Sequence, residues 1–275
     1  MKEQLKISKL QHNIYRIQED SSFMNVDSYL VCGEAYAVVI DGLGIAEGLY
    51  ECAGKLTDKP LYMIVTHGHP DHAGKGMQEF MEAECDIYIS YKDLYLLREM
   101  YGDNLKMEQF HNMENGMRFD LGGTSLEVIA MPGHTRGSMM LYMEKEKVLF
   151  SADAIGSGGL WMQLQESRPL TEYLESLSRL EVFLERNDSV KIYPGHSWQI
   201  EPYIEEGQDY LDMEYVRELK KLTIDIIEGR IEGEKTEIPM DIMEGIDIHS
   251  VKGRCVTDYC YDAEHIMEKE GIYER

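Results

Sequence analysis

Three histidines and one aspartate lie within six residues of this sequence, in the segment His-Gly-His-Pro-Asp-His at residues 67–72. Imidazole nitrogens suit zinc and similar divalent ions, and a carboxylate adds a harder ligand. In an extended segment His67 and His69 point the same way, so Asp71 and His72 must face another direction. The spacing therefore predicts two metal positions rather than one.

Three more candidate ligands each follow a strand-like run of apolar residues. They are His134 after Leu126–Ala130, Asp153 after Val148–Phe150, and His196 after Val190–Tyr193. The segment 67–72 likewise follows the continuous apolar run Leu61–Val65, which is typical of a strand covered on both faces. We expect one edge of a sheet to gather all of these side chains into a single cleft.

Strand-like runs alternate with segments of helical periodicity over most of the chain. Further strands are predicted at residues 12–18, 27–32, 35–40, Ile87–Ile89 and Met139–Met143. Helices are predicted at Gly74–Ala83, at Thr171–Glu185 with Thr171 as the N-cap, and around Val216, Leu219, Leu222, Ile226 and Ile231. Helices with one apolar face, mixed with strands, imply sheets with helices packed on their outer faces.

The charge of the chain restricts its partners more than its fold. Lys and Arg number 27 against 51 Asp and Glu, which gives a net charge of −24 over 275 residues. Such a charge repels nucleic-acid phosphates and anionic membrane surfaces unless a basic groove is hidden locally. The five cysteines, an odd number without metal-type spacing, and an N-terminus without a signal-like apolar stretch predict a cytoplasmic protein.

Residues 201–275 are more acidic than the rest, with 9 Lys and Arg against 21 Asp and Glu. No linker of Pro, Gly or Ser separates them from the preceding part. We therefore expect one domain over residues 1–275, with an acidic helical extension at about 201–275 that packs on the main body.

The ordered set of candidate ligands resembles the metallo-β-lactamase-fold superfamily, and within it the hydrolase branch that includes glyoxalase II and related lactonases. The motifs that match are His-x-His-x-Asp-His at 67–72, Gly-His at 133–134, Asp153, Gly-His at 195–196, and an early Asp41. The resemblance implies a four-layer αββα sandwich with a dinuclear metal site at one edge. It also implies a first metal held by His67, His69 and His134, a second held by Asp71, His72 and His196, and Asp153 bridging both. Asp41 would tether the metal-binding loop.

The chemistry implied by this resemblance is hydrolysis by a hydroxide that bridges two divalent ions, which we expect to be zinc, with manganese or iron as alternatives. Asp71 would be both a ligand and the proton carrier, and Trp161 would form an apolar wall for the substrate. We expect a small ester, thioester or lactone as substrate. The alternatives are a phosphodiesterase or phosphatase acting on a small phosphorylated molecule, and a non-catalytic metal-binding protein.

Two features restrict the substrate within this family. Zinc β-lactamases mostly carry Cys or Ser where Asp153 stands, which disfavours a β-lactam. Glyoxalase II grips glutathione with basic residues in its C-terminal part, whereas residues 201–275 are acidic here. From the net charge of −24 and the apolar Trp161 and Met162 that follow Asp153, we expect neutral or singly charged acyl substrates to be preferred.

Overall fold

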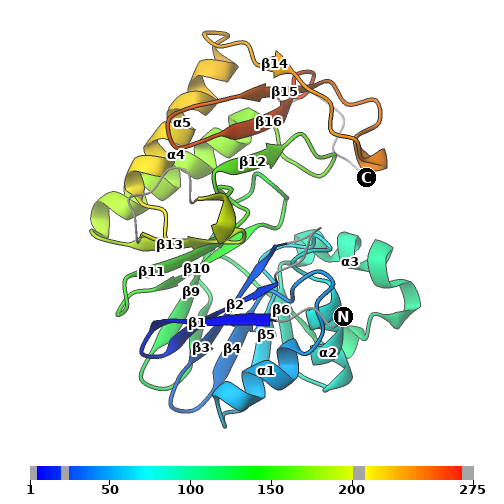
Figure 1. Ribbon diagram of the computed structural model, residues 1–275, viewed down its shortest axis with the longest axis vertical. Helices are drawn as coiled ribbons and strands as arrows, with labels where there is room; N and C mark the ends of the chain where they lie inside the picture. Colours follow the sequence, from blue (N-terminus) through cyan, green and yellow to red (C-terminus); the bar gives the residue numbers. More distant parts are fainter. Residues whose placement is uncertain (1–4, 20–24, 201–207, 268–275) are drawn as a thin grey trace.

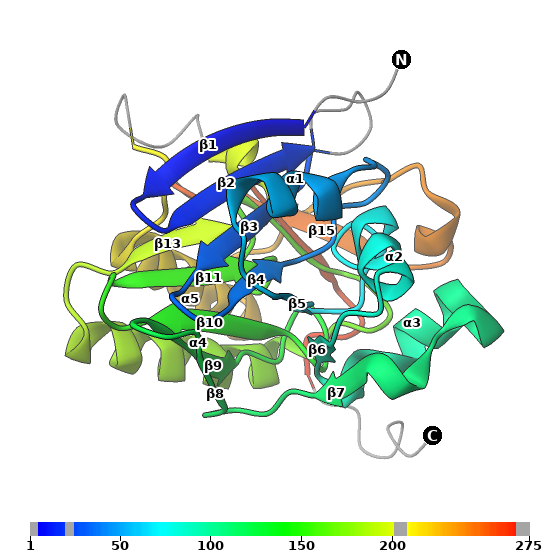
Figure 2. The same cartoon turned by 90° about the horizontal axis from the view of Figure 1, so that it is seen from below.

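The computed structural model describes residues 5–19, 25–200 and 208–267. Seven strands form its first sheet, in the order in which they occur along the chain. They are β1 (Leu5–Gln11), β2 (Ile14–Glu19), β3 (Asp27–Cys32), β4 (Ala37–Ile40), β5 (Leu61–Ile64), β6 (Ile87–Ile89) and β7 (Phe110–Asn112). The strands β1 to β4 are antiparallel, whereas β4 to β7 are parallel. Figure 2 shows β1 at one edge of this sheet and β7 at the other.

Five strands form the second sheet, in the order β13-β11-β10-β9-β8. Their bounds are β8 (Arg118–Asp120), β9 (Ser125–Ala130), β10 (Met139–Met143), β11 (Val148–Ala152) and β13 (Lys191–Pro194). Because β10 is antiparallel to both β9 and β11, and β13 is parallel to β11, the strands β9, β11 and β13 all end at the same edge.

Five α-helices cover the outer faces of the two sheets, with three on the first and two on the second (Figure 1). They are α1 (Leu49–Leu56), α2 (Lys75–Glu82), α3 (Leu94–Tyr101), α4 (Leu170–Arg186) and α5 (Met213–Ile227). The described residues also form five short 3₁₀ helices: η1 (Tyr91–Asp93), η2 (Gly102–Asn104), η3 (Met107–Gln109), η4 (Ser197–Gln199) and η5 (Asp241–Met243). This is the four-layer αββα sandwich that the resemblance implies.

The alternation of side chains along buried strands explains the layers. In β4, Val39 packs toward the helices α1 to α3, whereas Ile40 packs between the two sheets. In β11, Phe150 lies between the sheets and Leu149 faces α4 and α5. A strand that is apolar on both faces must be covered on both sides, as the apolar run of β5 predicts.

The helix α4 begins one residue earlier than expected, so Thr171 is not its N-cap. Pro169 occupies that position with φ −51°. Proline is tolerated there because its missing N–H would have no acceptor in the first turn. Similarly, α5 ends at Ile227, and Ile231 packs against the same core from the loop beyond it.

Among its described residues, the acidic extension is helical in α5 and in the short η5, and much of the rest is not helical, contrary to expectation. Its other described residues include three strands, β14 (Glu234–Lys235), β15 (Ile248–Val251) and β16 (Asp258–Asp262). These strands form a third sheet with β12 (Gly159–Met162), to which β16 is parallel. Residues 201–207 and 268–275 of the extension lie outside the described part.

Among the described residues, no helix combines the length and the apolar character needed to cross a bilayer.

Candidate metal centre

The candidate ligands lie in loops that leave the carboxyl ends of strands, as expected. Residues 67–72 follow β5, His134 follows β9, Asp153 directly follows β11, and His196 follows β13. The parallel pairing of β4 with β5, and of β11 with β13, brings these ends to one edge of the sandwich. The sheets therefore position the side chains, and the loops present them.

The seven candidate ligands form two adjacent clusters. The first contains His67, His69 and His134, all buried, with potential ligand atoms within 4.8 Å of one another. The second contains Asp71, His72, Asp153 and His196 with the same spread. In the first cluster, His134 Nε2 lies 2.9 Å from His69 Nδ1.

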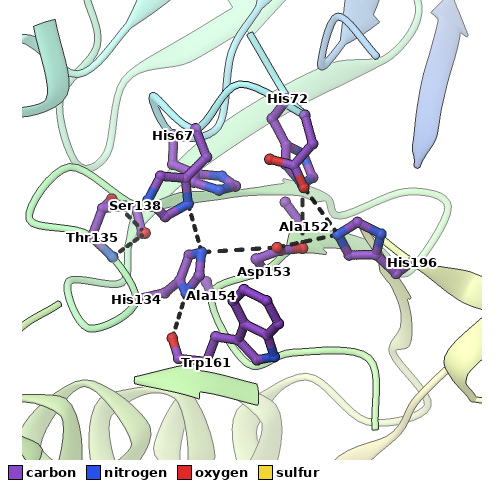
Figure 3. A network of polar contacts seen from close by, with 12 residues as sticks. His67, His72, His134, Thr135, Ser138, Ala152, Asp153, Ala154, Trp161 and His196 are labelled. Carbon is purple, nitrogen blue, oxygen red and sulfur yellow. Dashed lines mark hydrogen bonds and ion pairs between the residues drawn. The ribbon is translucent and has the colours of Figure 1, made fainter. Parts of the chain in front are cut away.

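Asp153 lies between the two clusters (Figure 3). Its Oδ1 is 3.3 Å from His72 Nε2 and its Oδ2 is 3.3 Å from His196 Nε2, both in the second cluster. The same Oδ2 is 3.8 Å from His134 Nε2 in the first cluster. Asp71 Oδ2 closes the second cluster at 3.4 Å from His196 Nε2.

Each of the five histidines has its outward-facing ring nitrogen in a polar contact. The partners are Thr66 Oγ1 for His67 Nδ1 (3.2 Å), Glu166 Oε1 for His69 Nε2 (2.5 Å), Asp41 Oδ2 for His72 Nδ1 (2.9 Å), the Trp161 carbonyl for His134 Nδ1 (2.7 Å) and the Asn25 carbonyl for His196 Nδ1 (2.9 Å). Such contacts orient imidazoles that bind metal ions. The other nitrogen of each ring points into its cluster.

The atoms aimed into the clusters fit divalent cations. His67 Nε2, His72 Nε2 and Asp153 Oδ1 are buried and have no hydrogen-bond partner among the described residues. Buried polar atoms without a partner are rare because each costs free energy. Imidazole and carboxylate donors form a typical set for zinc, manganese or iron.

The charges of the two clusters differ. Burial lowers the pKa of His67 well below its usual value and that of His134 to about 4, whereas the Glu166 carboxylate outweighs burial at His69 and raises its pKa. Burial also acts to lower the pKa of His72 and His196, but the carboxylates of Asp153 and Asp71 outweigh it and raise both well above their usual value. Positive charge is therefore stabilised beside the two carboxylates of the second cluster. A divalent cation can supply that charge.

The glycine of each Gly-His motif is required by close packing. A Cβ at Gly195 would lie 2.5 Å from Asp153 Oδ1 and 2.7 Å from His72 Cε1. A Cβ at Gly133 would lie 2.2 Å from the ring of Tyr173. A side chain at either position would therefore displace a candidate ligand or the helix α4 behind it.

Asp41 anchors the loop that carries residues 67–72. Besides its contact with His72, its Oδ1 accepts hydrogen bonds from the Thr66 backbone N–H at 2.8 Å and from Thr66 Oγ1 at 2.9 Å. Trp161 contacts the site through its backbone carbonyl, while its half-buried indole packs against a small core that includes Leu164 and Cys260.

Two acidic residues that no sequence motif marks also contact the site. Glu166 contacts His69. Asp93 is fully buried at the start of α3 and accepts hydrogen bonds from Thr135 Oγ1 at 2.6 Å and from the backbone N–H groups of Gly137 and Gly68. Neither residue lies in a motif, so no signal in the sequence marks it.

Comparison with known proteins agrees with this geometry. The family model of the metallo-beta-lactamase superfamily matches residues 22–196, and the chain belongs to that superfamily. The predicted family and fold are thereby confirmed. A metallo-beta-lactamase from Pontibacter korlensis has a similar fold, with a TM-score of 0.60 and 19% identity over 81% of this chain and 100% of that chain.

Several curated relatives share more sequence with the chain. The human acyl-coenzyme A thioesterase MBLAC2 is 31% identical over 216 residues, which cover 66% of this chain and 75% of that protein. The hydroxyacylglutathione hydrolase GloC of Haemophilus influenzae is 29% identical over 59% of this chain and 81% of its own length. With a beta-lactamase-like protein 2 homolog of Caenorhabditis elegans, 28% identical, the match spans only 49% of the relative's length.

Proposed function

We propose that this chain is a metal-dependent hydrolase of thioesters that uses two divalent ions, with zinc as the metal. The observation that carries the proposal is the convergence of seven donor side chains in two clusters that share Asp153. Relatives named as an acyl-coenzyme A thioesterase and a hydroxyacylglutathione hydrolase favour thioesters over other esters and lactones.

The residues divide into two sets. His67, His69 and His134 would hold one ion, Asp71, His72 and His196 would hold the other, and the Asp153 carboxylate would be shared between them. When bound, a pair of divalent ions lowers the pKa of water toward neutrality and polarises a carbonyl oxygen.

Asp71 is the residue that we assign to proton transfer. Its side chain keeps 24% of its surface exposed, so it borders the second cluster and the solvent at once. Neighbouring imidazoles, set against the opposing effect of burial, hold its pKa below the usual value, so the group is an ionised carboxylate at neutral pH. Trp161, half-buried next to His134, remains our candidate for an apolar wall beside the acyl group.

Metal analysis and a substrate panel test this function together. We expect close to two divalent ions per chain by elemental analysis, and faster hydrolysis of thioesters than of lactones, phosphodiesters or β-lactams. The variant Asp71→Ala should lose more than about 99% of kcat/KM, since it removes a ligand and the proton carrier. Asp86→Ala, which changes an exposed carboxylate that contacts His111, is the matched control.

One ion or fewer per chain in the presence of excess metal would contradict the dinuclear assignment. A phosphodiester cleaved faster than every thioester would instead support the phosphodiesterase alternative. Full activity of the Asp71 variant at normal metal content would remove Asp71 from proton transfer.

A further inference from the structure

A basic pocket with a volume of about 350 Å³ lies next to the loop that carries His134. Three cationic side chains line it, Lys92 from η1, Arg136 from the loop itself and Arg179 from α4. Asn115 and Ser176 add polar groups, and no Asp or Glu belongs to the lining. In a chain of net charge −24, three cations without a carboxylate in one pocket form a local reversal of charge.

Two cations of this pocket, Lys92 and Arg179, are exposed to solvent. Lys92 is exposed and has no ion-pair partner among the residues that the structure describes. Arg179 is exposed, donates a hydrogen bond to Ser176 Oγ at 2.9 Å, and has its nearest carboxylate, Glu175, at 4.0 Å. A concave surface lined by one sign of charge focuses its field on a ligand of the opposite sign.

The topology places this pocket at the same edge of the sandwich as the metal centre. Lys92 follows β6 and Asn115 follows β7, and both strands are parallel to β5, which leads into residues 67–72. The loop from Met131 to Met139 lines the pocket and also presents His134. A ligand in the pocket is therefore separated from the first cluster by one loop.

Tyr95 lies near charged groups of both the pocket and the metal centre. The phenol of Tyr95 interacts electrostatically with Arg136 of the pocket and with Glu166, which contacts His69. Burial, together with nearby acidic groups, raises the pKa of Tyr95 to about 12, so the phenol stays neutral between these charges.

We propose that the basic pocket formed by Lys92, Arg136 and Arg179 binds the phosphate groups of the thiol part of a thioester substrate, as found in coenzyme A. Guanidinium and ammonium groups bind phosphate oxygens through charge-assisted hydrogen bonds. Coenzyme A carries a diphosphate and a ribose phosphate, so its charges match those of the pocket. The inference rests on the thioesterase function proposed above, because it names the class of thiol that leaves.

This pocket changes the expectation that neutral substrates are preferred. That expectation uses the net charge of the whole chain, which describes the distant field but not the field inside a lined pocket. If the pocket binds phosphates, the thiol part of the preferred substrate carries negative charge. The acyl part is still expected to lie against apolar side chains.

Binding of 3′,5′-adenosine bisphosphate and of coenzyme A to the metal-loaded protein gives the first test, by calorimetry. The double variant Lys92→Gln/Arg179→Gln should weaken both affinities by about tenfold, the loss expected for two charged contacts that are partly exposed to solvent. The control Lys145→Gln/Arg186→Gln removes the same charge from exposed positions that do not line the pocket, and it should leave both affinities unchanged.

Kinetics with matched thioesters give the second test. The same acyl group is presented on coenzyme A, on pantetheine, which lacks phosphates, and on glutathione. We expect kcat/KM to be highest for coenzyme A, and the ratio of kcat/KM between coenzyme A and pantetheine to fall about tenfold in the pocket variant but not in the control.

The outcomes separate the two proposals. Equal affinities in the wild type and the pocket variant would overturn the pocket, because the phosphates would then bind elsewhere, for example at the metal ions. A ratio near one for coenzyme A over pantetheine, or a preference for glutathione, would also overturn it. Phosphate binding that depends on Lys92 and Arg179, without hydrolysis of any thioester, would support the pocket and contradict the proposed function.

Discussion

At the scale of single residues, the site depends on the outward-facing nitrogen of each histidine. A neutral imidazole carries one proton, so a hydrogen bond at one nitrogen decides which nitrogen offers its lone pair. His69 differs from the other four, because Glu166 holds its Nε2 and leaves Nδ1 to the first cluster. The carboxylate also outweighs the effect of burial and raises the pKa of His69.

Substitution of Glu166 should therefore reduce metal affinity in a graded way. Glu166→Ala removes the acceptor, and we expect metal affinity to fall by about tenfold to hundredfold, as for other residues that orient a ligand. Glu166→Gln keeps an acceptor oxygen without the charge, so its loss should be smaller. Competition with a metal-binding dye measures both affinities. Equal affinities for the alanine variant and the wild type would show that His69 needs no such partner.

At the scale of elements, Asp93 joins two loops that are distant in sequence. It lies where η1 meets α3, and its two carboxylate oxygens accept hydrogen bonds from the loop after β5 and from the loop after β9. Burial raises the pKa of Asp93, and these hydrogen bonds oppose that effect. The first cluster is built from the same two loops, so Asp93 holds its two halves together.

We expect Asp93→Asn to lower both stability and metal affinity. An amide offers only one acceptor oxygen, so its NH₂ group must face an N–H or O–H donor of one of the loops. An unsatisfied buried donor costs about 1–3 kcal/mol of unfolding free energy. Urea denaturation and metal titration measure the two effects, and Asp103→Asn, an exposed position in η2, is the control. An Asp93 variant as stable as that control would contradict the joining role.

At the scale of the whole molecule, the net charge of −24 opposes the compact state through mutual repulsion of the acidic groups. Many of the salt bridges are exposed at the surface and contribute little to stability. The basic pocket is a local exception within this acidic field.

Added salt should therefore raise the melting temperature of the metal-loaded protein. At 0.15 M ionic strength the screening length is about 8 Å, which weakens repulsion between distant surface charges more than it weakens close pairs. Calorimetric scans at low and high NaCl measure the shift. The shift should shrink in the variant Glu232→Gln/Glu234→Gln/Glu244→Gln, in which three exposed acidic groups are neutralised. A melting temperature that falls with salt would contradict this account.

The family, the four-layer fold and the seven candidate ligands could all be predicted from the sequence. The candidate ligands occur in short motifs directly after apolar runs, so local spacing alone marks them, as in residues 67–72 after β5. Long elements with strong periodicity, such as α4, were likewise visible. The reason is that these signals involve neighbours along the chain.

Only the tertiary structure decided which distant residues support the site. Glu166 lies 97 positions from His69, and Asp93 lies 42 positions from Thr135. The pairing of β12 with β16, and the meeting of Lys92 with Arg179, also depend on how whole elements pack. A single acidic or basic residue forms no periodic pattern and no motif in the sequence. Its role depends on the neighbours that the fold brings close to it.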